Sequence, residues 1–219
     1  MELKNLRLLG GKLCIDFANS FDNVGPGQRL DFIGSYEDFV RWSRHVELLS
    51  AANARELDQL AAEHEDEAGA VYRRALELRA ALRDVLGQIA VGAVVSPDAL
   101  TVIEQEYQRA VAAIHLTPDH GRFEWDWQTT AAQLDQPLWP LALSAVDLLT
   151  GGETRRVKLC ASHGCGWLFY DQSKNRSRRW CSMEGCGSQD KMRRHYRKRK
   201  QATERAQPRD KARPPAPTA

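Results

Sequence analysis

The last third of the chain contains four cysteines in two matched pairs. Four residues separate Cys160 from Cys165, four separate Cys181 from Cys186, and 15 residues lie between the pairs. Two short loops that each supply two thiolates are what a single tetrahedral metal ion requires. The spacing therefore predicts one zinc ion. Because four sulfur ligands leave no open position for water or substrate, its predicted role is structural.

Three other interpretations of the cysteines remain open at this point. The four thiols could be buried without a metal, or their spacing could be accidental. His163 could replace Cys160 or Cys165 as a ligand, although four cysteines already complete a site. The fifth cysteine, Cys14, lies among alternating apolar residues and is expected to be a small core side chain rather than a reactive thiol.

The charge of the chain is divided unevenly. The formal net charge is +2, but residues 1–154 carry 13 Lys and Arg against 24 Asp and Glu, while residues 155–219 carry 18 against 5. An acidic body and a basic C-terminal module are expected to have different partners. The basic module is the one suited to phosphate groups.

Basic residues lie between the cysteine pairs and in a helix predicted after Cys186. Met192 and Tyr196, four residues apart, could pack on the zinc knuckle, while the rest of this helix is basic and suits a nucleic-acid groove. The alternative is a solvated face, or a counter-charge to the acidic body. The candidates for nucleic-acid contacts are Arg176, Arg178, Arg179, Lys191, Arg193, Arg194, Arg197 and Lys198.

The body that precedes this module is predicted to be mainly helical. Alternation over residues 6–18 predicts a strand, residues 19–27 a loop, and residues 123–127 a second strand that could pair with the first. Helices are predicted from Ser35 as N-cap, over 51–65, along the apolar stripe from Val71 to Ile89, from Ser96–Pro97, and over 136–150. The predicted fold class is α+β, with domains at 1–153 and 154–205 and a disordered tail at 206–219.

Three polar residues follow or interrupt the first apolar segment. Asp16, Asn19 and Arg29 could line a small-molecule pocket, which would make the body a sensor. The alternative is a purely structural role, with a buried Asp16–Arg29 pair and Asn19 in a turn. These residues identify no particular ligand.

Other classes of protein find little support in the sequence. There is no signal-peptide h-region near the start and no apolar run approaching 18 residues, so the expected compartment is the cytoplasm, where thiols stay reduced. No glycine-rich phosphate loop, H-E-x-x-H motif or G-x-S-x-G elbow occurs. The chain is not expected to be an enzyme.

Two segments resemble known families. The run from Cys160 to Cys186, with Trp167-Leu168-Phe169-Tyr170-Asp171 and Ser177-Arg178-Arg179-Trp180-Cys181-Ser182-Met183, resembles the CGNR zinc finger family. The body resembles the ABATE domain that precedes this finger in bacterial proteins, through residues 10–20 (GGKLCIDFANS), Arg29 and Trp42. The resemblance implies a stress-related transcription regulator. The family's Cys-Gly-Asn-Arg is here Cys186-Gly187-Ser188-Gln189, which leaves the zinc ligands intact but changes two residues that could contact the target.

Together these observations predict a DNA-binding transcription regulator. A structural zinc module and basic helix would bind double-stranded DNA, and the body could respond to a small effector. The runner-up is a zinc-dependent adaptor that binds RNA or an acidic protein. The oligomeric state is not predicted.

Overall fold

The computed structural model describes residues 6–25, 28–127 and 132–206. Of the disordered tail predicted at 206–219, Ala206 is instead the last residue of a helix, and residues 207–219 lie outside the described residues. The body contains α1 (Leu13–Ala18), β1 (Phe21–Gly25), β2 (Gln28–Asp31), α2 (Tyr36–His45), α3 (Ala51–Glu63), α4 (Glu65–Val91), α5 (Pro97–Ala112), β3 (His115–Asp119), β4 (Arg122–Asp126) and α6 (Leu138–Thr150). The C-terminal part contains η2 (Thr154–Arg156), β5 (Val157–Leu159), β6 (Leu168–Tyr170), the π-helical turn η3 (Met183–Gly187) and α7 (Ser188–Ala206).

The mainly helical α+β prediction is confirmed. Ser35 begins α2 as an N-cap, its hydroxyl accepting a hydrogen bond from the backbone N–H of Asp38 at 3.2 Å. Ser96 and Pro97 begin α5, and α4 ends at Gly92, whose φ of 70° is the left-handed value that glycine adopts without a steric penalty. The last body helix starts at Leu138, two residues later than predicted.

The strand predicted over residues 6–18 is wrong, because its second half forms the helix α1. Cys14, Ile15, Phe17 and Ala18 are all buried there. A short helix that is covered on several sides needs apolar residues on more than one face, so its sequence resembles a buried strand. Burial raises the pKa of Cys14 to about 11, and this thiol is a core group as predicted.

The strands of the body form two separate antiparallel hairpins. The loop predicted over residues 19–27 contains β1, which pairs with β2. The strand predicted over 123–127 exists as β4, but it pairs with β3, which comes just before it in the chain. His120 and Gly121 make the tight turn with φ values of 43° and 82°, as two-residue hairpin turns require. Pairing with the first predicted strand is therefore also wrong, since that segment is helical.

The buried side chains form one core that extends from the body into the C-terminal part. Helix α4 crosses the body and contacts α1, α5 and the β5–β6 hairpin. Val157, Leu168 and Phe169 of this hairpin belong to the same buried cluster as Phe17 and Trp42 of the body. The body thus supplies the apolar contacts that the small zinc module lacks.

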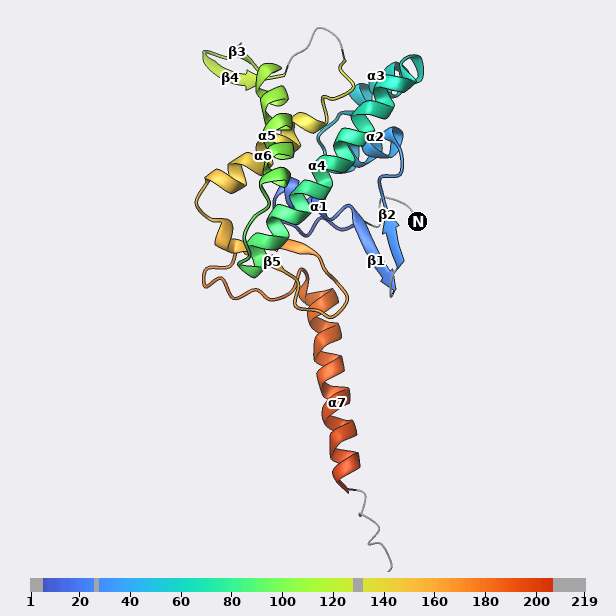
Figure 1. Ribbon diagram of the computed structural model, residues 1–219, viewed down its shortest axis with the longest axis vertical. Helices are drawn as coiled ribbons and strands as arrows, with labels where there is room; N and C mark the ends of the chain where they lie inside the picture. The colour runs from blue at the N-terminus through green and yellow to red at the C-terminus, as the bar shows by residue number, and fades with distance from the viewer. Residues whose placement is uncertain (1–5, 26–27, 128–131, 207–219) are drawn as a thin grey trace, which may run out of the picture.

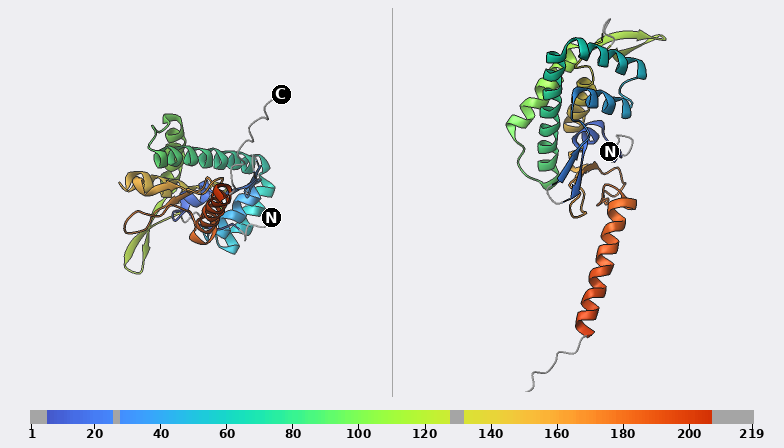
Figure 2. Two further views of the ribbon diagram at one scale, coloured as in Figure 1. Left: turned by 90° about the horizontal axis from the view of Figure 1, so that it is seen from below. Right: turned by 90° about the vertical axis from the view of Figure 1, so that its right-hand side faces the viewer.

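Helix α7 projects away from the rest of the molecule. Figure 1 shows it leaving the zinc module at the end opposite the β3–β4 hairpin, and the right-hand view of Figure 2 shows the same projection from the side. Within the described part of the chain, no helix combines the length and apolar character needed to span a membrane.

Candidate metal centre and nucleic-acid interface

The four cysteines of the two pairs meet at one point. Their Sγ atoms all lie within 4.8 Å of one another, with 3.7 Å between Cys165 and Cys181 and 3.6 Å between Cys181 and Cys186. Sulfurs placed about 2.3 Å from a tetrahedral zinc ion are separated by about 3.8 Å. The observed spacing therefore fits one structural zinc ion. His163 is not among the residues that converge on this point in the described structure.

The electrostatics of the cluster favour a divalent cation. Hydrogen bonds from Cys165 and Cys181 lower the pKa of the Cys160 thiol. The same contacts raise the pKa of Cys165 and Cys181, because their sulfurs lie beside the Cys160 thiolate. Thiolates packed this closely repel one another, and a bound zinc ion would neutralise that repulsion and hold all four groups deprotonated.

Local backbone geometry positions the thiols of each pair at the metal site. Gly164 and Gly166 flank Cys165 with φ values of 82° and 67°, so the chain can turn sharply on both sides of this ligand. The backbone N–H of Cys181 points at the Cys160 sulfur at 3.4 Å, which connects the two pairs. The π-helical turn η3 then carries Cys186 directly into α7, so that the helix begins at the metal site.

A buried carboxylate organises the loop between the pairs. The side chain of Asp171 is fully buried and accepts hydrogen bonds from Lys158 Nζ at 2.6 Å, the Ser173 hydroxyl at 2.6 Å and the Arg178 backbone N–H at 3.0 Å. Burial alone would raise the pKa of Asp171, but these hydrogen bonds hold it well below its usual range. Lys158 Nζ also donates to the carbonyl of Arg176. The Lys158–Asp171 pair therefore fixes the loop that carries Arg176, Arg178 and Arg179.

The three predicted contact residues in this loop differ in their surroundings. Arg178 is half-buried: its guanidinium lies 4.6 Å from the Phe169 ring and donates to the carbonyls of Trp180 and Cys181. It therefore stabilises the second cysteine pair. Arg176 lies 3.8 Å from Glu153, whereas Arg179 is exposed and lies over the Trp180 ring. Arg179 is the most accessible of the three.

The remaining candidates all lie on α7 and are exposed. These residues are Lys191, Arg193, Arg194, Arg197 and Lys198. Arg194 is paired with Asp190 one helical turn earlier, at 2.8 Å. The prediction that Met192 and Tyr196 pack on the knuckle is wrong, because these side chains are 66% and 71% exposed. Figure 1 shows the helix leaving the zinc module directly, and beyond its first turn it projects away from the other described elements.

Asn19 joins the body to the zinc module. Its side-chain N–H donates to the Leu168 carbonyl at 2.8 Å, and its side-chain oxygen accepts from the Leu168 N–H at 3.0 Å. Asn19 is 2% exposed, so both bonds are shielded from water. The amide thus pairs with β6 as a neighbouring strand would. Both polar ends of this candidate ligand-binding group are already engaged within the protein.

Asp16 and Arg29 were the other candidates for a ligand site in the body. The Asp16 carboxylate accepts the Gly10 backbone N–H at 2.8 Å, and burial raises the pKa of Asp16 to about 6. A side chain at Gly10 would collide with the Asp16 backbone nitrogen, 2.8 Å from an added Cβ. The Gly10 carbonyl accepts a hydrogen bond from the Tyr170 N–H of β6 at 2.7 Å. Arg29 belongs to β2, but nothing beyond its backbone is described, so the predicted Asp16–Arg29 pair lies outside the described part of the structure.

A body arginine that sequence reasoning missed also reaches the zinc module. Arg83 of α4 donates to the carbonyls of Ala18 at 3.3 Å and Gly166 at 3.2 Å, and its guanidinium lies 4.3 Å from the Phe21 ring. Gly166 follows the ligand Cys165. The apolar stripe of α4 identifies the core face but does not show which polar residue reaches a distant carbonyl. Sequence reasoning also missed the Lys158–Asp171 pair, because the fold and not a local pattern brings these two side chains together.

Comparison with known families agrees with this architecture. Residues 11–152 match the family model ABATE, whose description is "Putative stress-induced transcription regulator". Residues 156–199 match the CGNR zinc finger. No curated protein matches the chain in sequence. The first match covers most of the chain and the second contains all four clustered cysteines, so this protein belongs to the ABATE family and carries a CGNR zinc finger after its ABATE domain.

Proposed function

We propose that the chain is a transcription regulator that binds double-stranded DNA through its zinc finger and α7. The observation that carries this proposal is the position of α7. The helix starts at the metal site, projects from the body, and holds eight Lys and Arg against two Asp and Glu among its 19 residues. A strongly basic helix that projects alone gains little stability from packing within the protein, and its positive charge favours binding to a polyanion.

The zinc finger would fix the direction in which this helix leaves the body. Zinc binding by Cys181 and Cys186 holds the segment just before α7, and the Asn19 and Arg83 contacts hold the finger on the body. Exposed Arg179 lies in the same module and extends the basic surface beyond α7. The acidic body would repel DNA and leave the finger and helix as the binding surface.

DNA binding of this kind should depend strongly on salt. The logarithm of the association constant should fall with the logarithm of salt concentration by about 0.9 per neutralised phosphate. Substituting Arg193 and Lys198 together with glutamine should reduce the magnitude of this slope by about 2. The measurement is a fluorescence anisotropy titration of zinc-loaded protein with duplex DNA across a range of salt concentrations.

A matched variant controls for net charge. Arg44 and Arg55 are exposed on the body, so replacing both with glutamine removes the same charge far from α7 and should leave the slope unchanged. Equal slopes for the two double variants would refute α7 as the phosphate-binding element. Competition with RNA of matched length tests the adaptor alternative, because preferential binding to RNA would contradict the proposed DNA target.

We also infer that the body binds a small effector, at a place different from Asp16 and Asn19. Two adjacent hollows of about 410 Å³ and 360 Å³ share Gln133 and Asp135 as lining residues. Compounds that bind there should raise the thermal midpoint of the wild type and have less effect on Gln133→Ala. A metabolite panel tested by thermal shift provides the measurement. The absence of any stabilising compound would count against a sensor.

We propose no catalytic activity for the chain. Four cysteine ligands complete a closed zinc site, in which the metal has no open position for a substrate. The buried carboxylates Asp171 and Glu106 are engaged by Lys158 and by Arg74 and Arg109. These ion pairs serve the fold, which supports a binding protein over an enzyme.

A further inference from the structure

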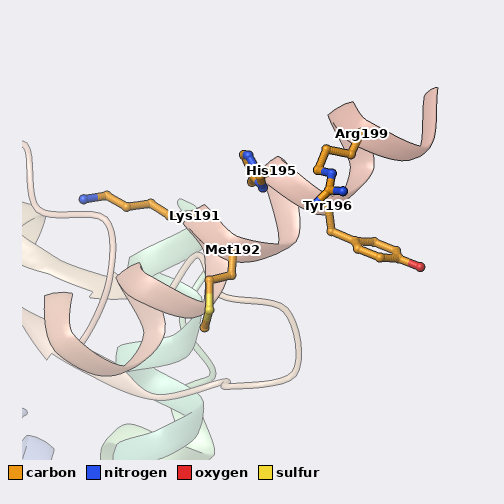
Figure 3. A pocket seen from close by; sticks show the side chains of 5 residues that line it. All are labelled: Lys191, Met192, His195, Tyr196 and Arg199. Carbon is orange, nitrogen blue, oxygen red and sulfur yellow. The ribbon is translucent and has the colours of Figure 1, made fainter. Parts of the chain in front are cut away.

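Among the described residues, helix α7 has two large apolar side chains, Met192 and Tyr196, that lie exposed one turn apart. Lys191, Met192, His195, Tyr196 and Arg199 line a shallow furrow along one side of the helix, which we call the α7 furrow (Figure 3). Its apolar members, Met192 and Tyr196, are four residues apart and lie on the same face. Exposed apolar side chains that recur at helical spacing commonly mark a contact surface.

The charge around the furrow restricts what can cover it. Lys191 and Arg199 border the two apolar residues, and α7 as a whole has a formal net charge of +6. A second copy of α7 would bring the same positive charge and be repelled. The occupant should therefore be a polyanion that also presents apolar groups. Duplex DNA meets both conditions in its major groove, which is wide enough to admit an α-helix.

Helical geometry places the basic residues where such a groove needs them. With 100° of rotation per residue, Lys198 lies next to Lys191 on one side of the furrow, Arg193 is the basic residue beyond Tyr196 on the other side, and Arg197 lies on the opposite face. When one face of a helix lies against the bases in the major groove, a sugar–phosphate backbone of the DNA runs along each side of the helix. Arg193 and Lys198 would then meet phosphates, whereas Arg194 is held by Asp190.

We propose that the α7 furrow reads bases by binding the C5-methyl group of thymine in the major groove. Among the groups that base pairs present there, this methyl is the apolar one, so Met192 and Tyr196 match it chemically. The phosphate contacts carry no sequence information, and the furrow would supply it. This inference rests on the proposed DNA-binding function and names the residues that give it specificity.

The test uses the full-length, zinc-loaded protein and a duplex selected by it from random sequences. Each thymine is replaced in turn by uracil, which removes only the methyl group. Wild-type protein should bind the substituted duplex about fourfold more weakly at each thymine whose methyl is buried. In the Met192→Ala, Tyr196→Ala double variant this difference should disappear, while the salt dependence of binding remains.

Controls separate this inference from the proposed function. Met183→Ala removes a methionine that is 52% exposed outside the furrow, and it should keep the discrimination between thymine and uracil. If the wild type binds DNA in a salt-dependent manner but ignores the methyl groups, or if the double variant still discriminates, the inference is wrong and DNA binding stands. If zinc-loaded protein fails to bind duplex DNA, both proposals are overturned. Equal zinc content and helical circular dichroism verify that each variant is folded.

Discussion

Replacing Cys181 with serine is expected to abolish zinc binding and unfold the zinc finger. The apparent free energy of zinc binding to small finger peptides is about 10–16 kcal/mol at neutral pH, and much of it stabilises the folded state. Whole domains are stable by only about 5–15 kcal/mol, so the finger cannot keep its structure without this contribution. The Cys181 sulfur is central to the cluster, lying within 3.7 Å of the Cys165 and Cys186 sulfurs.

The effect should extend into the body. Leu168 and Phe169 belong to the same buried core as the body helices, so unfolding of the finger exposes apolar surface on α1 and α4. We expect the thermal midpoint of the whole chain to fall, and a chelator to produce the same change in the wild type. Zinc content by atomic emission and unfolding by circular dichroism measure the two effects.

Cys14→Ser is the matched control for this experiment. It makes the same chemical change at a fully buried cysteine outside the cluster, and the new hydroxyl can donate to the Ser144 carbonyl as the thiol does. This variant should retain one zinc ion per chain. Wild-type zinc content in Cys181→Ser, or loss of zinc in Cys14→Ser, would contradict the assignment of ligands.

Replacing Asn19 with alanine is expected to lower the free energy of unfolding by about 2–6 kcal/mol. The substitution leaves the N–H and the carbonyl of Leu168 without partners in a site shielded from water, and each unsatisfied buried group costs about 1–3 kcal/mol. Asn19→Asp should be at least as damaging, because a carboxylate would then face the Leu168 carbonyl. Denaturant unfolding of zinc-loaded protein measures both changes.

Asn175 provides the comparison for Asn19. It is exposed in the loop of the zinc module, and Asn175→Ala should change stability by less than about 0.5 kcal/mol. A small effect of Asn19→Ala, similar to that of Asn175→Ala, would show that the finger does not depend on this amide. Retained zinc content in Asn19→Ala would confirm that the loss arises at the contact with the body.

Several elements could be predicted because their signals are local. Ser35 marks the start of α2 through its capping hydroxyl, and Pro97 marks the start of α5 through its ring, whereas the Ser96 side chain makes no capping hydrogen bond. The stripe from Val71 to Ile89 identifies α4 because a long helix with one buried face has a clear period. The α1 segment was misread because a short, widely buried helix has no such period, and only contacts with other elements reveal what covers it.

The four zinc ligands and the basic helix after them can be predicted from residue type and spacing along one short segment, and the acidic body from composition alone. The pairing of Asn19 with Leu168, 149 residues away, and the contacts by which Asp171 and Lys158 shape the basic loop are visible only in the folded molecule. The same holds for Met192 and Tyr196, which are exposed instead of packed on the knuckle. Such pairings depend on which distant surfaces the fold brings together, and no local pattern encodes them.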